Sequence, residues 1–179
     1  MEPLQIWLVQ LLEQDNPVAP FMRTAWGWPM MESLHFISLS MLVGAIGMFD
    51  LRLLGVGRRI PMAAARRLVP WGLGGFVVSI LTGMTFLMTE PNQYIYNPAF
   101  LLKVLFMVVA GINAAIFAVM PFGRQLPDNG GATPRSAKVI ATISLCLWIA
   151  TILSGRLITF YRPGICNPNE TRTIATCIP

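Results

Sequence analysis

Four apolar stretches, each long enough to cross a lipid bilayer, constrain the fold of this chain more than any other feature. They cover residues 29–54, 71–89, 99–120 and 139–160, and a transmembrane helix needs about 20 mostly apolar residues. Only 12% of the residues are charged, against about 25% in soluble domains. The sequence predicts an all-α integral membrane protein with a bundle of four transmembrane helices, and its hydropathy excludes a nucleic-acid-binding domain.

The segments on either side of the predicted transmembrane domain, residues 29–162, have different characters. Within residues 1–28, apolar side chains recur at helical spacing over residues 2–14, which predicts an amphipathic helix. Such a helix lies on the membrane interface, or it docks on a partner protein. These apolar residues are Leu4, Trp7, Leu8, Leu11 and Leu12. Residues 163–179 form a polar C-terminal tail.

Basic residues gather in the two loops that join the first span to the second and the third span to the fourth. Cytoplasmic loops of membrane proteins carry an excess of Lys and Arg. We therefore expect both loops in the cytoplasm and both termini on the outer side. The residues are Arg58, Arg59, Arg66 and Arg67 in the first loop, and Arg124, Arg135 and Lys138 in the second.

Two of the three cysteines, Cys166 and Cys177, fall in the outer tail. Disulfides persist in oxidising compartments, so we expect these two residues to form a bridge. Cys146 lies in the middle of the fourth span and is interpreted as a small apolar packing residue.

A layer of polar residues lies near the outer ends of the spans. His35, the only histidine, follows Glu32 by three residues in the first span, and Lys103 and Arg156 lie at a similar depth in the third and fourth. Thr82 falls in the outer half of the second span. Ionisable residues at membrane depth are costly and mark functional sites. A structural alternative is that both cations reach the interface, Glu32 neutralises one of them, and His35 packs as a hydrogen-bonded residue.

A second set of residues points to structural roles. We expect Asp50, near the inner end of the first span, to pair with an arginine of the adjacent loop, and Asn113 to hydrogen bond another helix. Small residues spaced four apart allow helices to approach closely. They are Gly75, Ser79 and Gly83 in the second span, and the same is expected of Gly44 and Gly47 in the first.

These segments together resemble a bacterial inner-membrane family whose domain has no known function. The resemblance spans roughly residues 25 to 162 and is carried by the segments Glu32-Ser33-Leu34-His35, Asp50-Leu51-Arg52-Leu53-Leu54-Gly55, Asn97-Pro98-Ala99-Phe100-Leu101-Leu102-Lys103, Ala110-Gly111-Ile112-Asn113 and Gly155-Arg156, with Gly44, Thr82-Gly83 and Phe86. The chain is also distantly similar to copper-resistance protein D-like proteins and to four-helix b-type cytochromes. This resemblance implies a four-helix bundle in the bacterial inner membrane, and haem or metal binding. In that membrane the two outer termini are expected in the periplasm.

One departure from that family concerns the third span. A second histidine often ends it there, whereas this chain reads Phe117-Ala118-Val119-Met120. A site with two histidine ligands within one subunit is therefore excluded.

The first functional hypothesis is a haem-binding electron-transfer subunit, with a non-covalent b-type haem because the chain has no Cys-x-x-Cys-His motif. The sixth iron position is then empty, or filled by a methionine or by another subunit. The predicted site residues are His35 as the axial ligand, Glu32 to orient it, Lys103, Arg156 and Arg23 for the propionates, and Met31 or Met84 as the sixth ligand.

Two alternatives remain open. Copper(I) prefers thioether and imidazole ligands, and His35 with Met30 and Met31 provides them. The third hypothesis is a structural or assembly subunit of a larger membrane complex without a cofactor. The sequence contains no catalytic constellation, so an enzyme is not expected. A short chain with one layer of four helices is expected to form a homo-oligomer or to join a larger complex.

Overall fold

The computed structural model describes residues 2–13, 16–57, 59–120, 133–161, 164–165 and 177–178. Four helical segments in it are long and apolar enough to cross a membrane, as the sequence predicted. They are α3 (Gly27–Leu54), α4 with α5 (Met62–Arg66 and Val69–Thr89), α7 (Pro98–Val119) and α9 (Arg135–Leu157). The protein is thus a helical bundle with the features of a multi-pass membrane protein.

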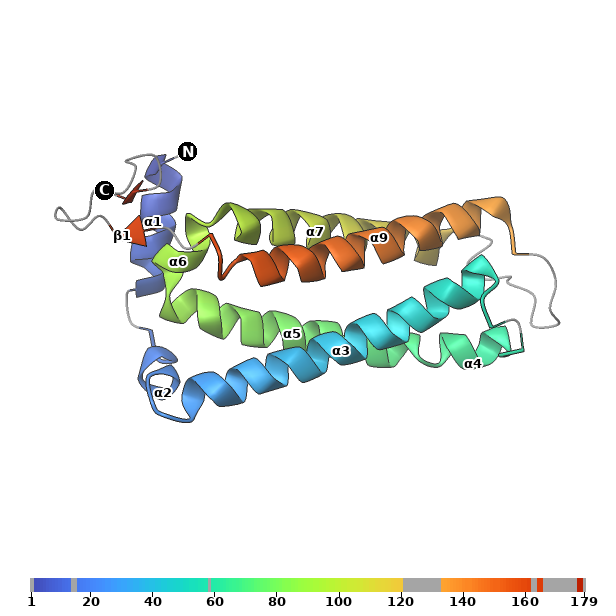
Figure 1. Ribbon diagram of the computed structural model, residues 1–179, viewed down its shortest axis with the longest axis horizontal. Helices are drawn as coiled ribbons and strands as arrows, with labels where there is room; N and C mark the ends of the chain where they lie inside the picture. The colour runs from blue at the N-terminus through green and yellow to red at the C-terminus, as the bar shows by residue number, and fades with distance from the viewer. Residues whose placement is uncertain are drawn as a thin grey trace.

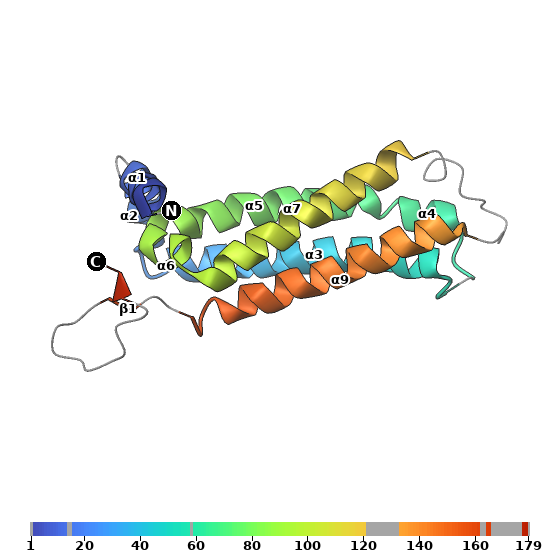
Figure 2. The ribbon, with the colours of Figure 1, turned by 90° about the horizontal axis from the view of Figure 1, so that it is seen from above.

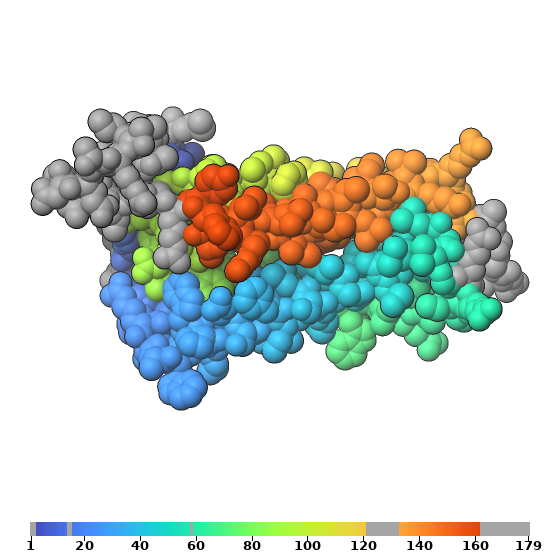
Figure 3. Space-filling model, viewed as in Figure 1, coloured from blue at the N-terminus to red at the C-terminus, as the bar shows by residue number. Residues whose placement is uncertain are grey.

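The long helices run side by side as two antiparallel pairs (Figures 1 and 2). Helix α3 packs most extensively against α5, and α7 packs against α9. Contacts between α3 and α9 join the two pairs, and the side chains of these two helices meet along one face of the molecule (Figure 3). This arrangement leaves α5 and α7 with little mutual contact.

Shorter elements lie at the two ends of the bundle. Helix α1 (Glu2–Glu13) crosses one end beside α6 (Pro91–Ile95), with α2 (Ala19–Met22) nearby (Figure 1). We call this the N-terminal end. The predicted N-terminal helix is confirmed, and its position on a membrane interface stays a prediction.

A two-residue parallel pair of strands, β1 (Gly164–Ile165) and β2 (Cys177–Ile178), belongs to the C-terminal tail. Cys166 lies outside the described residues, so the Cys166–Cys177 disulfide stays a prediction. Cys146 is a free, exposed cysteine of α9, so its side chain does not pack in the interior as the sequence suggested.

Helix α4 and the start of α9 share the opposite end of the bundle, which we call the basic end (Figure 1). Arg66 ends α4, and Arg135 and Lys138 lie in the first turn of α9 or just after it. The described basic residues of the two predicted loops therefore belong to one end, as the topology requires. Burial at this end centres on Phe49 and Leu53 of α3 with Met62 of α4.

Close backbone contact between α3 and α5 depends on the small residues of α5. A Cβ atom added to Gly75 would lie 2.6 Å from the Ser38 carbonyl oxygen and 2.9 Å from the Leu42 nitrogen. The predicted tight packing of this stripe is confirmed. The same expectation for Gly44 is wrong, because a Cβ there would meet nothing within 4 Å, so this glycine faces outward rather than toward a helix.

Two asparagines hold α7 against α9. Asn97, fully buried at 0% exposure, caps α7 by accepting a hydrogen bond from the Ala99 N–H at 3.0 Å. Its amide also donates to the Ile158 carbonyl at 2.9 Å. Further along, the Asn113 amide donates to the Ile140 carbonyl at 3.2 Å, which confirms the predicted hydrogen bond to another helix.

Candidate functional site

The imidazole of His35 lies inside the N-terminal half of the bundle. Only 9% of this residue is exposed, and its Nδ1 lies 2.7 Å from Thr82 Oγ1. This hydrogen bond crosses from α3 to α5, the pair of helices whose backbones approach most closely. Tight packing of the two helices therefore fixes the position of the ring.

The hydroxyl of Thr82 is the hydrogen-bond partner of His35 Nδ1, and the direction of this bond depends on the tautomer of the ring. Thr82 Oγ1 donates its hydrogen to the carbonyls of its own helix, at 2.8 Å to Val78 and 3.1 Å to Ser79. A hydroxyl has one hydrogen and two acceptor lone pairs, so when it donates to either carbonyl it accepts from His35 Nδ1. In that arrangement a neutral imidazole carries its proton on Nδ1, and Nε2 keeps a lone pair for a metal or a hydrogen-bond donor.

Aromatic and small residues enclose the ring. The edge of Phe86 meets it with ring centroids 5.7 Å apart, and Trp28 covers Phe86 at 5.0 Å. On the α5 side, a Cβ added to Gly83 would lie 3.6 Å from His35 Cε1. Apolar walls of this kind exclude water and strengthen any electrostatic interaction of the ring.

The ammonium of Lys103 comes from the other helix pair and points into the bundle. This half-buried side chain of α7 lies over Gly155 of α9, with Nζ 3.6 Å from the position that a Cβ of Gly155 would take. Its charge is within electrostatic reach of His35. Within the residues that the structure describes, Lys103 has no carboxylate partner. An ammonium in this position attracts an anionic group.

The structure brings His35, Thr82 and Lys103 together and places the other predicted residues elsewhere. Glu32, Arg156, Arg23 and Met84 are exposed, and Met31 is half-buried. Helical geometry explains two of these positions. Glu32 is turned by about 60° from His35 around α3, and Arg156 by about 100° from Gly155 around α9, at 3.6 residues per turn.

The sequence placed Thr82 at the right level, but its bond with the histidine was not predicted. A regular signal was available, since Ser79, Thr82, Phe86 and Thr89 are buried residues of α5 at spacings of three or four. These residues mark the face of α5 that turns toward α3. Among the described residues, no group of three His, Cys, Asp or Glu side chains is close enough to hold a metal ion.

Comparisons with known proteins point to a family and assign no activity. The model of DUF6644, a family of unknown function, matches residues 26–161. No curated protein and no solved structure matches the chain.

Proposed function

The chain belongs to DUF6644, a family of unknown function, and from its own side chains we propose that it binds one b-type haem non-covalently and acts as an electron-transfer subunit. One observation carries the proposal. Inside the same half of the bundle, a buried imidazole whose Nδ1 is hydrogen-bonded to Thr82 lies within electrostatic reach of an ammonium that has no carboxylate partner among the described residues.

The residues present fit such a group. Histidines that bind metal usually donate the other ring N–H to an oxygen, which fixes the tautomer and the ring orientation. Thr82 is this oxygen acceptor for His35. A haem also carries two propionates, and Lys103 offers the cation for one of them. When bound, the haem supplies one-electron redox chemistry.

The protein would contribute position, electrostatics and exclusion of water. The hydrogen bond to Thr82 holds Nδ1, so Nε2 faces away from the Thr82 hydroxyl. Phe86 and Gly83 pack against the ring. Low polarity around an iron ligand controls its redox potential. Lys103 would neutralise negative charge at the edge of the site.

The remaining predicted contacts belong to this proposal as well. Arg23 and Arg156 are exposed cations at the same end of the bundle, where they can pair with a propionate that reaches the surface. Met31, Met84 or a group from a second subunit would supply the sixth iron ligand. Glu32 would help to orient the histidine from its exposed position. We place the site in the periplasmic half of a bacterial inner membrane. The proposal includes the distant similarity to b-type cytochromes and to copper-resistance protein D-like proteins.

A second candidate is a structural subunit of a larger membrane complex. The observation that favours it is the His35–Thr82 hydrogen bond itself, which joins α3 to α5 at 2.7 Å without any ligand. Buried polar contacts of this kind stabilise helix pairs in membranes. Copper binding is the third candidate. Its predicted ligands besides His35 are the exposed Met30 and the half-buried Met31, which lie at the surface of the bundle.

The test is an absorption spectrum of the protein purified from haem-replete cells. The wild-type protein should show a Soret band, and His35→Ala should abolish it while the helix content is retained. Thr82→Val, which keeps the shape and removes the oxygen, should keep the haem and shift its reduction potential. Lys103→Ala should weaken haem retention by about tenfold, as loss of one charge-assisted hydrogen bond does.

The control for Lys103 is Lys138→Ala, which removes the same charge at the basic end and should leave the spectrum unchanged. A wild-type protein without a Soret band would refute the haem proposal. If His35→Ala and Thr82→Val then lower the unfolding temperature equally and the double variant adds nothing, the histidine is a structural link between α3 and α5. Stoichiometric copper that is lost in His35→Ala would favour the third candidate.

A further inference from the structure

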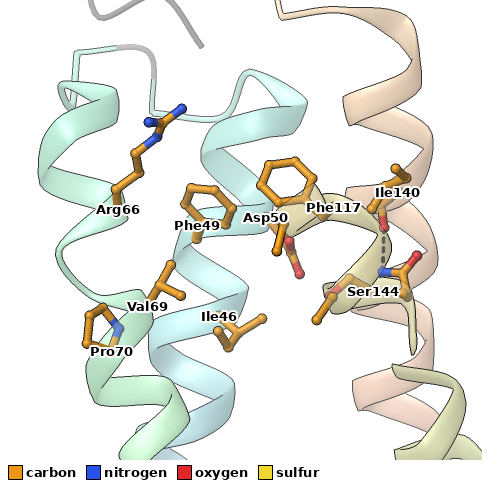
Figure 4. A pocket seen from close by; sticks show the side chains of 12 residues that line it. Ile46, Phe49, Asp50, Arg66, Val69, Pro70, Phe117, Ile140 and Ser144 are labelled. Carbon is orange, nitrogen blue, oxygen red and sulfur yellow. Dashed lines mark hydrogen bonds between the residues drawn. The ribbon is translucent and has the colours of Figure 1, made fainter. Parts of the chain in front are cut away.

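A pocket of about 380 Å³ lies between the long helices toward the basic end (Figure 4). Its volume falls within the range of about 300–1,000 Å³ that is usual for small-molecule sites. It lies outside the His35 site, because Asp50 in its wall follows His35 by fifteen residues, or about 22 Å along α3. Most of the wall is apolar, formed by residues such as Ile46, Val69 and Ala114.

One polar group in the wall, the carboxyl of Asp50, is incompletely satisfied. Asp50 is 4% exposed, and Ser144 of α9 lines the same pocket. Its Oδ2 is closed off from water and has no hydrogen-bond partner among the residues that the structure describes. A buried acceptor without a donor is costly, so a donor from outside the described residues would stabilise this oxygen.

The sequence predicted that Asp50 pairs with a loop arginine, and among the described residues no arginine hydrogen bonds its Oδ2. Arg52 is buried but turns away, donating from Nε to the Ile60 carbonyl at 2.6 Å. Arg66 lies at the edge of the pocket, and Figure 4 shows its guanidinium directed toward the loops, away from the carboxyl. Neither of these two arginines therefore donates a hydrogen bond to Oδ2.

The neighbours of the carboxyl do not supply the donor either. Asn113 donates one of its two amide hydrogens to the Ile140 carbonyl, and the other makes no hydrogen bond to Asp50 Oδ2. Two aromatic rings, Phe49 and Phe117, stand beside the carboxyl, edge to face with centroids 5.6 Å apart. This end of the pocket thus combines hydrogen-bond acceptors, a carboxyl group and aromatic walls.

We propose that this pocket binds a small organic amine as its ammonium, with an N–H directed to Asp50 Oδ2 and an apolar ring or short chain against the walls. An ammonium satisfies the orphan acceptor, pairs with the charge, and is attracted by aromatic faces. The apolar lining selects a hydrophobic body. A metal ion fits less well, because no group of three His, Cys, Asp or Glu side chains occurs in the described part.

The positive charge of Arg66 at the edge of the pocket does not prevent entry of an amine. A neutral amine crosses the bilayer and takes the proton of a protonated Asp50, or an ammonium meets the ionised carboxylate. Both routes end in the same ion pair with the same number of protons. The proposal does not depend on haem binding at His35.

The test is equilibrium dialysis of labelled benzylamine against the full-length protein in lipid nanodiscs, with empty nanodiscs to subtract partitioning. Asp50→Asn keeps the shape of the side chain and should weaken binding at least tenfold, as expected for a hydrogen bond to a charged group. Glu90→Gln, which removes an exposed carboxylate outside the pocket, should leave binding unchanged. Benzyltrimethylammonium has the ring and the charge without an N–H, and should bind at least tenfold more weakly than benzylamine.

A second variant keeps the test decisive if Asp50→Asn fails to assemble. Ala114→Phe fills the pocket from α7 without changing the carboxyl, and should also abolish saturable binding. Equal binding by the wild-type protein and Asp50→Asn would overturn the proposal, as would unchanged affinity in Ala114→Phe. No saturable binding of benzylamine by the wild-type protein would overturn it as well.

Discussion

Substituting Gly75 by alanine tests whether the contact between α3 and α5 organises the N-terminal half of the bundle. The added methyl group would lie 2.6 Å from the Ser38 carbonyl oxygen and 2.9 Å from the Leu42 nitrogen. Both are backbone atoms of α3, so no side chain can rotate away and the helices must separate. Overpacking of this kind costs about 1–3 kcal/mol.

A gain in helix propensity opposes that cost. Alanine is more favourable than glycine in a helix by about 0.8–1.0 kcal/mol. Because the two contacts are shorter than real Cβ contacts allow, we take the upper end of the steric range, and the net destabilisation of Gly75→Ala is about 2 kcal/mol. The matched control is Gly44→Ala, where the new methyl group meets nothing within 4 Å. That variant should be neutral or more stable by up to about 1 kcal/mol.

The assay is reversible unfolding in mixed detergent micelles, followed by helical circular dichroism. The propensity gain is common to both variants, so the difference between them isolates the steric cost at Gly75. Separation of α3 from α5 should also weaken the His35–Thr82 hydrogen bond, because Thr82 follows Gly75 by seven residues, or about 10 Å. Equal stabilities of the two variants would refute the close backbone contact.

Three further predictions concern other parts of the molecule. Asn97→Ala removes the cap of α7 and leaves the Ile158 carbonyl without its donor, so it should lower stability by about 2–4 kcal/mol; a melting temperature equal to that of the wild-type protein would contradict this. A C-terminal alkaline phosphatase fusion should be active and a C-terminal fluorescent protein dark, because the basic loops are expected in the cytoplasm; the reverse pattern would invalidate the orientation. Mass measurement in nanodiscs should show a homo-oligomer or a larger complex, since the four-helix layer leaves large apolar side chains of α7, such as Leu105 and Ile112, exposed; a monomer alone would count against it.

The sequence by itself determined the number and approximate limits of the long helices. About 20 apolar residues in a row admit few alternatives to a membrane-spanning helix, since the backbone must satisfy its own hydrogen bonds in lipid. The position of His35 near the first end of the first span followed from the same reading. Small residues at four-residue spacing also indicated correctly that α5 packs closely against a neighbour.

The tertiary structure alone decided which polar residues meet. Depth along a helix follows from residue number, whereas direction around the helix depends on the rotation of each helix against its neighbours. For this reason Lys103 turns into the bundle toward His35 while Glu32 and Arg156, at similar depth, stay exposed. The same rotation places Asp50 beside Ser144 of α9 in the wall of one pocket, because the neighbours of a buried carboxyl are set by helix packing, which no local sequence pattern encodes.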